Sequence, residues 1–314
     1  MQGGEVLDGK VNDVEPFFVL GISYRSGTNY LARLLEQHPR ISTGPVPEDF
    51  VAAKLPVMDD YVRRVTAEWN PRWGIESNRA RLIAGISDGL QGFLTSSSEP
   101  GTRYVLNRTP SVSGLAHLRK FFPTNRVIIL VRDGRSVVES GMRSFDWRMD
   151  DAARAWASAA ETIKTFREDD ARPERTMIVR YEDVVTDPVQ TVQTLLDFLG
   201  LAMDEYPAGS AENAPVIGSS DLRSSGGHTQ IHWDPTEPDD FAPLRRYDQW
   251  SQGKHRRFDW LAGNALRELG YLTEPMPRSV PNLLVQHGKT MLGFCRPSAL
   301  RLRLRRLIRG HPLR

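Results

Sequence analysis

The chain has 314 residues, of which 39% are hydrophobic, and its formal net charge is +2. This length and apolar content are enough to bury one large core, and no apolar run reaches the roughly 18 to 20 residues of a membrane span. A single cysteine, Cys295, permits no disulfide within the chain. Because the first residues also lack the pattern of a signal peptide, we expect a cytoplasmic protein.

The charge is distributed unevenly along the chain. Residues 296–314 contain seven arginines and no acidic residue, and subtracting these seven charges from the net +2 leaves −5 on the first 295 residues. An acidic body argues against a domain that grips nucleic acid over its whole face. The basic tail also carries leucines at helical spacing, which suits peripheral contact with an anionic membrane, docking on the acidic body, or a solvated segment.

The first ordered segment is a buried strand that runs into a cationic, hydroxyl-rich turn. Residues 17–21 are apolar or glycine, and residues 24–29 read Tyr-Arg-Ser-Gly-Thr-Asn. Leucines at helical spacing then predict a helix over 28–37. A turn from a strand into a helix presents free backbone N–H groups, so this turn is expected to bind an anion.

The stretch 44–100 has weak periodicity, turns marked by tryptophan and proline, and a serine cluster at 96–98. These features favour an irregular insertion that forms the wall of a pocket.

Strands and helices alternate beyond this stretch. Strands are expected over 104–106, 126–131 and 176–180, and helices over 111–122, 135–143, 151–166 and 188–199. Such alternation predicts a three-layer α/β fold in which a central parallel sheet is flanked by helices, as in P-loop-like proteins.

The last part of the chain is less regular. Glycine, serine and proline dominate 207–243, which predicts a long loop, and a helix is expected over 255–269. We therefore expect a main domain over 13–275 and a basic C-terminal appendage over 276–314.

The first turn is similar to a P-loop but lacks its lysine. Arg25 precedes Ser26, Gly27 and Thr28, where a nucleotide triphosphatase has Gly-Lys-Ser/Thr and uses the lysine on the phosphates. What remains is a backbone cradle with one guanidinium and two hydroxyls. This combination suits a 5′ phosphate group that needs no metal.

A second cationic turn follows the strand 126–131. Arg132 ends that strand, and Ser140 lies about two turns into the next helix. An arginine and a hydroxyl near a helix start would suit a second, separate phosphate. The two turns together predict a bisphosphorylated nucleotide.

These motifs resemble those of the sulfotransferases that use 3′-phosphoadenosine 5′-phosphosulfate (PAPS), and in form most closely the tyrosylprotein and related membrane-type enzymes. The shared patterns are Arg-Ser-Gly-Thr at 25–28, Arg-Asp-Gly-Arg at 132–135 and His-Pro at 38–39. Further similarity lies at 107–110, 180–183 and 219–221, so the resemblance covers most of residues 17–270.

The resemblance implies a role for each matching residue, with PAPS as co-substrate and no metal. The implied 5′-phosphosulfate loop comprises Arg25, Ser26, Gly27, Thr28 and Asn29. The implied 3′-phosphate site comprises Arg132 and Ser140, to which Arg143 would add a second cation. The remaining edges of the nucleotide would be held by Tyr181, Ser219 and Ser220.

Two cationic positions depart from the family pattern. Where relatives carry a lysine before the Thr-Pro at 109–110, this chain has Arg108, which can neutralise charge on the bridging oxygen but does not readily give up a proton. For the family's late nucleotide-capping lysine, the sequence leaves Arg245, Arg246 and Lys254 as candidates.

Sulfuryl transfer requires a base that accepts the proton of the acceptor hydroxyl. The resemblance places a glutamate shortly after the His-Pro motif, and Glu48 is near that place with Asp49 beside it. Cytosolic relatives use a histidine, for which His117 is the candidate. We prefer Glu48 as the base, with Arg25 and Arg108 as its catalytic partners, and the other two candidates stay open.

The resemblance thus implies transfer of a sulfuryl group to a hydroxyl of a carbohydrate, lipid or small metabolite. Two alternatives are a P-loop-like nucleotide kinase, which the missing lysine disfavours, and a nucleotide-binding module without catalysis. The acceptor pocket is expected to be formed by 44–100 and 207–243, but neither stretch specifies the acceptor.

Overall fold

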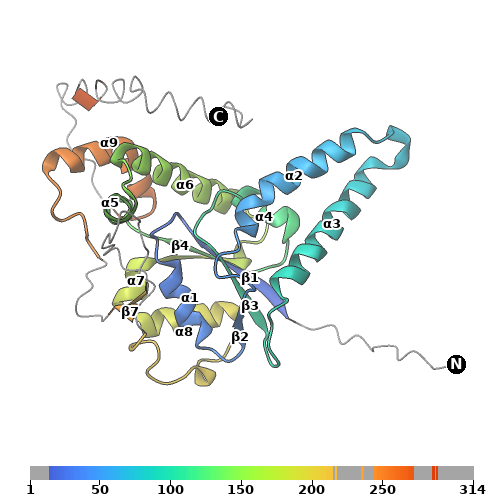
Figure 1. Cartoon of the computed structure of the whole chain (residues 1–314), viewed down its shortest axis with the longest axis horizontal. Coiled ribbons are helices and arrows are strands. Elements are labelled where there is room, and N and C mark those ends of the chain that lie inside the picture. The colour runs from blue at the N-terminus through green and yellow to red at the C-terminus, as the bar shows by residue number, and fades with distance from the viewer. Residues whose placement is uncertain are drawn as a thin grey trace, which may run out of the picture. The chain divides into compact units, whose positions relative to one another are not determined.

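The computed structural model describes residues 14–214, 216–217, 235–236, 244–271, 285–286 and 288. Its centre is a five-stranded parallel sheet with the strand order β2-β3-β1-β4-β5 (Figure 1). The strands are β1 Glu15–Gly21, β2 Ile41–Thr43, β3 Tyr104–Thr109, β4 Val127–Val131 and β5 Thr176–Arg180. The expected central parallel sheet is confirmed.

The middle of the sheet is built from continuous apolar runs. β1 pairs with β3 on one side and with β4 on the other, so that Phe18 lies opposite both Asn107 and Val127. Every residue of β4 and all but the first of β1 are buried. A strand that is covered on both faces is a continuous apolar run in the sequence, which explains why β1 and β4 were recognisable.

Helices cover both faces of the sheet (Figure 1). On one face, Phe17 and Val19 of β1 belong to a buried cluster with Leu31 and Leu34 of α1 and Leu195 of α8. This layer contains α1 Thr28–Glu36, α7 Tyr181–Thr186 and α8 Pro188–Leu199. The expected three-layer arrangement is therefore confirmed.

On the opposite face, the ring of Phe18 lies 4.7 Å from the ring of Phe122, which follows α4. Trp156 and Phe166 of α6 are also buried. This layer contains α4 Leu115–Phe121, α5 Gly134–Phe145 and α6 Met149–Asp169.

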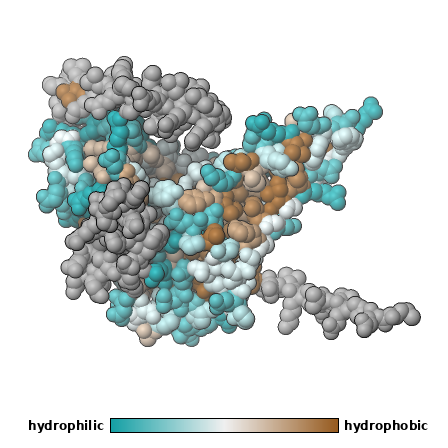
Figure 2. Space-filling view, in the orientation of Figure 1, coloured by the Kyte–Doolittle hydropathy of each residue, from teal (hydrophilic) through white to brown (hydrophobic). Residues whose placement is uncertain are grey.

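The expectation of an irregular insertion over 44–100 is wrong for most of its length. The segment forms a helical hairpin of α2 Val51–Ala67, the short turn Pro71–Trp73 and α3 Ile75–Leu94, which projects from the sheet layers (Figure 1). Figure 2 shows hydrophobic side chains gathered along this hairpin. Only Ser87 and Leu94 of α3 are buried. The apolar residues of this helix therefore do not form one regular buried face that could be recognised in the sequence.

Short or polar elements also differ from the expectation. β3 extends to Thr109, three residues beyond the apolar run, and its last three residues are polar yet buried. The short strand β2 and the short helix α7 have no recognisable sequence pattern of their own. The helix expected over 255–269 is α9 Gln252–Glu268.

The chain divides into two compact units, Met1–Asp248 and Gln249–Arg314. The first unit contains the sheet, and also β6 Val216–Ile217 and β7 Pro235–Thr236, which pair antiparallel. The second contains α9, where Arg257 donates a hydrogen bond to the carbonyl of Gln286 over 3.0 Å. A domain boundary after residue 275 stays a prediction, because 272–284, Cys295 and the tail 296–314 lie outside the described residues. Among the residues that are described, no helix combines the length and apolarity that a membrane span requires.

Candidate active site

The first turn is tightly packed against its own backbone. A Cβ atom added to Gly21 would lie 2.3 Å from Oγ of Ser26. The Ser26 hydroxyl is fully buried and donates a hydrogen bond to the carbonyl of Ser23 over 2.7 Å. Arg25, between these residues, has φ of 70°, in the left-handed region that non-glycine residues rarely occupy. Glycine and a buried hydroxyl therefore fix the turn in a conformation that the arginine alone would not prefer.

Tyr181 lies directly on this turn. Gly27 has φ of 97°, and a Cβ atom there would be 2.3 Å from two ring carbons of Tyr181. Tyr181 begins α7 immediately after β5 and is only 2% exposed. Burial raises the pKa of its phenol, so the group stays neutral in the physiological range. The structure thus joins two of the candidate positions that are far apart in the sequence.

The second turn contacts the first through two hydrogen bonds. Arg132, the residue after β4, donates from its guanidinium to the carbonyl of Arg25 over 2.7 Å, and its guanidinium lies 4.2 Å from the centroid of the Tyr181 ring. Arg25 donates through Nε to Oγ of the buried Ser140 over 3.0 Å. The two cationic turns consequently form one site at the carboxyl ends of β1 and β4.

This site concentrates positive charge. Burial, together with the charges of Arg132 and Arg246, lowers the pKa of Arg25 to about 10. Arg246 also acts electrostatically on Tyr181, which places it near the same cluster. Guanidinium groups that crowd together in a partly buried site favour a multiply charged anion.

Arg246 is therefore the late cation that the structure brings to the donor side. Arg245, by contrast, is paired with Asp248 at 3.4 Å and its side chain is 75% exposed. Lys254 belongs to the second unit, where its ammonium lies 5.8 Å from the centroid of the Trp250 ring.

The second turn is held rigidly by its neighbours. Asp133 accepts a hydrogen bond from the backbone N–H of Arg135 at the start of α5 and also forms an ion pair with the Arg135 side chain. Trp156 donates from its indole to the carbonyl of Arg132 over 3.2 Å. Arg143 pairs with Glu139 on the same helix over 2.7 Å and its side chain is 55% exposed. These contacts give Arg143 a carboxylate partner on its own helix.

Arg108 defines a second, adjacent part of the site. It belongs to the carboxyl end of β3, where it lies beside Val19 of β1, and it is 9% exposed. Its Nε is buried without a hydrogen-bond partner among the described residues. Burial lowers the pKa of Arg108, while the charges of Glu48 and Glu36 oppose that shift. An arginine with two carboxylates nearby and an unused donor can bind a further polar group.

Glu48 lies near Arg108 and near Tyr24 of the first turn. Burial raises the pKa of its carboxyl, and the charge of Arg108 opposes that rise. The charge of Glu48 in turn raises the pKa of Tyr24, which neighbours Arg25. The structure therefore brings Glu48 close to Arg108 and to Tyr24, the residue before Arg25.

The two other candidate bases have structural partners. Oδ1 of Asp49 accepts a hydrogen bond from the backbone N–H of Val51, the first residue of α2, over 2.7 Å. Nδ1 of His117 lies 3.1 Å from a carboxylate oxygen of Asp59 on α2, an ion pair when the ring is protonated. The ion pair favours a role in the α2 hairpin for His117. Asp49 also donates its backbone N–H to the carbonyl of Arg108 over 3.2 Å, and burial raises the pKa of its carboxyl, so it stays a candidate for the base.

A cavity of about 560 Å³ opens beside Arg108. It is bounded by one face of α1, by the loop between β2 and α2, and by the end of β3. The lining residues are Asn29, Arg33, Glu36, Thr43, Gly44, Pro45, Val46, Pro47, Leu106 and Arg108. The expected pocket wall thus reduces to residues 44–47 of the stretch 44–100.

Sequence reasoning missed Arg33 and Glu36 as site residues. Their spacing from Asn29, four and seven residues, places all three on one face of α1 and could have revealed them. Ser219 and Ser220, in contrast, lie outside the described residues.

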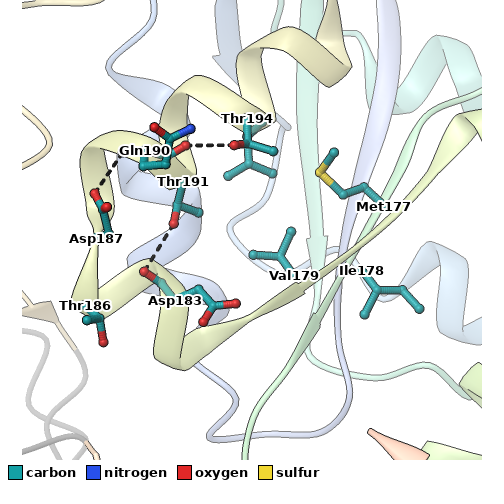
Figure 3. A pocket seen from close by; sticks show the side chains of 10 residues that line it. Met177, Ile178, Val179, Asp183, Thr186, Asp187, Gln190, Thr191 and Thr194 are labelled. Atoms are coloured by element: carbon teal, nitrogen blue, oxygen red, sulfur yellow. Dashed lines mark hydrogen bonds between the residues drawn. The ribbon is translucent and has the colours of Figure 1, made fainter. Parts of the chain in front are cut away.

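A second cavity of about 460 Å³ lies along the edge strand β5, between that strand and helices α7 and α8 (Figure 3). Its polar side chains are engaged in local helix contacts: Thr191 donates to the carbonyl of Asp183, and Thr194 donates to the carbonyl of Gln190. Asp187 accepts from the backbone N–H of Gln190. The cavity has acidic and apolar walls, so it does not suit an anionic nucleotide.

The geometry defines an α/β protein with a cationic site for a polyanionic ligand next to a pocket that contains carboxylates. A model of the sulfotransferase family matches residues 16–205. Protein-tyrosine sulfotransferase 1 of Danio rerio is 30% identical over 209 residues, which cover 60% of this chain and 54% of that protein. Protein-tyrosine sulfotransferase A of Caenorhabditis elegans is 23% identical, with coverages of 63% and 53%.

Among solved structures, the sulfotransferase domain from the curacin biosynthetic pathway matches with 17% identity and a TM-score of 0.47, covering 83% of this chain and 99% of that domain. The chain spans about half the length of the curated relatives that it matches. Because the family model covers more than half of the chain, the protein belongs to the sulfotransferase family.

Proposed function

We propose that the protein transfers a sulfuryl group from PAPS to the hydroxyl of an acceptor molecule. The observation that carries this proposal is the convergence of Arg25, Arg132 and Arg246 on the contact between Gly27 and Tyr181. A bisphosphorylated nucleotide presents separate anionic groups, and a cluster of guanidiniums held by two turns matches that charge distribution.

The described residues fit the donor in the roles that the family pattern suggests. The backbone of 25–29 would cradle the 5′-phosphosulfate at the start of α1, where N–H groups are free. Arg132 and Ser140 would hold the 3′-phosphate, and Tyr181 would support the nucleotide beside Gly27. We add Arg246 to this set and give Arg143 a secondary role, since it already has a carboxylate partner.

On the acceptor side, residues of this chain would accept one proton and offset one developing negative charge. PAPS supplies the sulfuryl group: a bond forms between the acceptor oxygen and sulfur while the bond from sulfur to the phosphate oxygen breaks. Glu48 would accept the hydroxyl proton, for which a carboxyl pKa raised by burial is suitable. Arg108 and Arg25 would offset the charge that develops on the leaving oxygen.

Calorimetry with 3′,5′-adenosine bisphosphate (PAP) tests the donor site without knowledge of the acceptor. We expect micromolar binding to the wild type and binding at least tenfold weaker, about 1.4 kcal/mol, for Arg132→Ala. Arg81→Ala, on an exposed position of α3, is the matched control and should bind as the wild type does. A preference for ATP with Mg²⁺ would instead favour a kinase.

We also propose a cytoplasmic location, supported by the use of a single cysteine in 314 residues. The basic segment 296–314 would allow peripheral contact with an anionic membrane, and no nucleic-acid partner is proposed. Cell fractionation at low and high salt would check both points, because electrostatic membrane contact is lost at high salt.

A further inference from the structure

We propose that the cavity beside Arg108 selects a neutral, hydroxyl-rich acceptor, a glycoside or a comparable polyol, through Arg33 and Glu36 of α1. This inference rests on the proposed function, because it concerns the acceptor of the same reaction. It adds the chemical class of the substrate and two residues that would recognise it.

The first support is the position and size of the cavity. It begins at Arg108 and Asn29, next to the first turn, and extends along α1 to Glu36. Its volume of about 560 Å³ lies within the range of about 300 to 1,000 Å³ that small-molecule sites occupy. An acceptor bound there would have one end beside the donor turn and Glu48, and the rest of the molecule against α1.

The second support is the contrast between the walls. Asn29, Arg33 and Glu36 present amide, guanidinium and carboxylate groups from one face of α1. The facing loop contributes Pro45, Val46 and Pro47, which have no side-chain hydrogen-bonding groups. A sugar ring matches both walls at once, because its hydroxyls lie around the edge while its C–H groups form an apolar face.

The third support is the balance of charge. Arg33 and Arg108 are offset by Glu36 in the cavity and Glu48 next to it. Glu36 lies close enough to both arginines that their charges lower the pKa of its carboxyl against the rise that burial causes. A polyanionic acceptor, such as a uronic acid chain or a tyrosine peptide rich in acidic residues, would gain no net attraction from this balanced set of charges.

The fourth support is a pair of buried polar atoms that lack partners within the described part of the chain. They are Oδ1 of Asn29, an acceptor, and Nε of Arg108, a donor, and both residues line the cavity. Buried polar groups are normally paired, so these two are available to a bound molecule. One hydroxyl can donate to Oδ1 of Asn29 and accept from Nε of Arg108. A polyol has further hydroxyls for Arg33 and Glu36, whereas a simple phenol has none.

The expected selectivity follows from these unpaired groups. A site built to hydrogen-bond several hydroxyls rejects analogues that lack them, since the buried groups are then left without partners. We expect neutral glycosides to exceed simple phenols and acidic peptides by at least tenfold in kcat/KM.

The test starts with PAP binding, which separates the two proposals: if PAP does not bind, the proposed function fails and this inference fails with it. If PAP binds, PAP release from PAPS is then measured with methyl β-D-glucopyranoside, methyl β-D-galactopyranoside, methyl α-D-mannopyranoside and maltose. The comparison acceptors are p-nitrophenol, methyl β-D-glucuronide and a tyrosine peptide flanked by glutamates. A best acceptor among these three would overturn the inference and leave sulfuryl transfer standing.

Variants then assign the effect to α1. We expect Glu36→Gln to raise the KM for the preferred glycoside at least tenfold and to leave the PAP Kd within twofold of the wild type. Glu68→Gln, the same change on an exposed residue after α2, is the control and should alter neither value. Equal KM values for Glu36→Gln and the wild type would contradict the inference.

If none of the acceptors reacts, saturation-transfer NMR tests whether the four neutral sugars bind to the enzyme that is saturated with PAP. Binding that Glu36→Gln weakens supports the inference. Absence of sugar binding at 10 mM, about ten times the weakest KM usual for enzymes, overturns it.

Discussion

The proposed donor side and the proposed acceptor side of the site differ in their balance of charge. The donor side gathers Arg25, Arg132 and Arg246 around Tyr181. The acceptor side combines arginines with carboxylates, since Arg33 and Arg108 lie near Glu36 and Arg108 also lies near Glu48.

This contrast indicates that the two halves meet different demands. A concentration of guanidinium groups suits a nucleotide that carries several anionic groups. Balanced charges give an anion no net attraction, so a ligand is selected there by its hydrogen bonds. We therefore expect the donor half to be the property shared with the family and the acceptor half to determine the individual substrate.

The largest expected effect comes from removing the carboxylate of Glu48 beside Arg108. Glu48→Gln keeps the shape of the side chain but cannot accept a proton, so kcat should fall by roughly 10² to 10⁴-fold. PAP affinity, a property of the donor half, should stay within twofold. Single-turnover measurements with PAPS and a responsive acceptor would check the first value and calorimetry the second; wild-type kcat would exclude Glu48 as the base.

A second test targets the contact that holds the donor half together. Gly27→Ala places a Cβ 2.3 Å from the Tyr181 ring at a φ of 97°, so both the ring and the backbone must shift. We expect at least tenfold weaker PAP binding and a loss of roughly 1 to 3 kcal/mol in the free energy of unfolding.

The matched control for this variant is Gly85→Ala in α3, where an added Cβ meets nothing within 4 Å. That change should stabilise the protein by up to about 1 kcal/mol, because alanine favours a helix over glycine. Thermal unfolding would distinguish the two alanines, and equal melting shifts would show that the Tyr181 contact is unimportant.

The pH dependence of kcat/KM tests whether the protonation of Glu48, in the acceptor half, controls activity. Burial raises the pKa of Glu48, and the protonated carboxyl cannot act as a base. Activity should therefore be present above the raised pKa and fall about tenfold per pH unit below it, with the acid limb at higher pH than an exposed glutamate would give. The residual activity of Glu48→Gln should lack this limb.

The smallest expected effect concerns the neighbour of the base. Asp49→Ala removes the acceptor for the N–H of Val51 at the start of α2 and should cost about 1 kcal/mol of stability. Its kcat should stay within threefold of the wild type. A loss of turnover comparable to that of Glu48→Gln would transfer the role of base to Asp49.

The sequence predicted the sheet well where strands are buried on both faces, as in β1 and β4. The half-buried edge strand β5 was also recognisable, because it is a short, largely apolar run before a turn, and helix α8 matches its expected bounds of 188–199. The turn residues 25–29 were likewise recognisable, because the chemistry of an anion-binding turn is local in the chain.

What the sequence did not predict depends on contacts between distant segments. Asn107, Arg108 and Thr109 continue β3 because the site buries them, although polar residues usually indicate a loop. α3 has glycine at 85, 89 and 92 and little burial, so its helical pattern was weak. Similarly, only the tertiary structure shows that Glu48 and Asp49 both lie near Arg108 and that Asp49 also binds the start of α2.

Arg25 places stability and function in opposition at a single position. Its φ of 70° is one that glycine or asparagine adopts at lower cost, and its guanidinium is crowded by two like charges. Laboratory evolution that selects only for heat resistance should therefore replace Arg25 early, and the resulting protein would be more stable while the donor site lost its central cation. A thermostable descendant of this chain would have to be screened for PAP binding in every round.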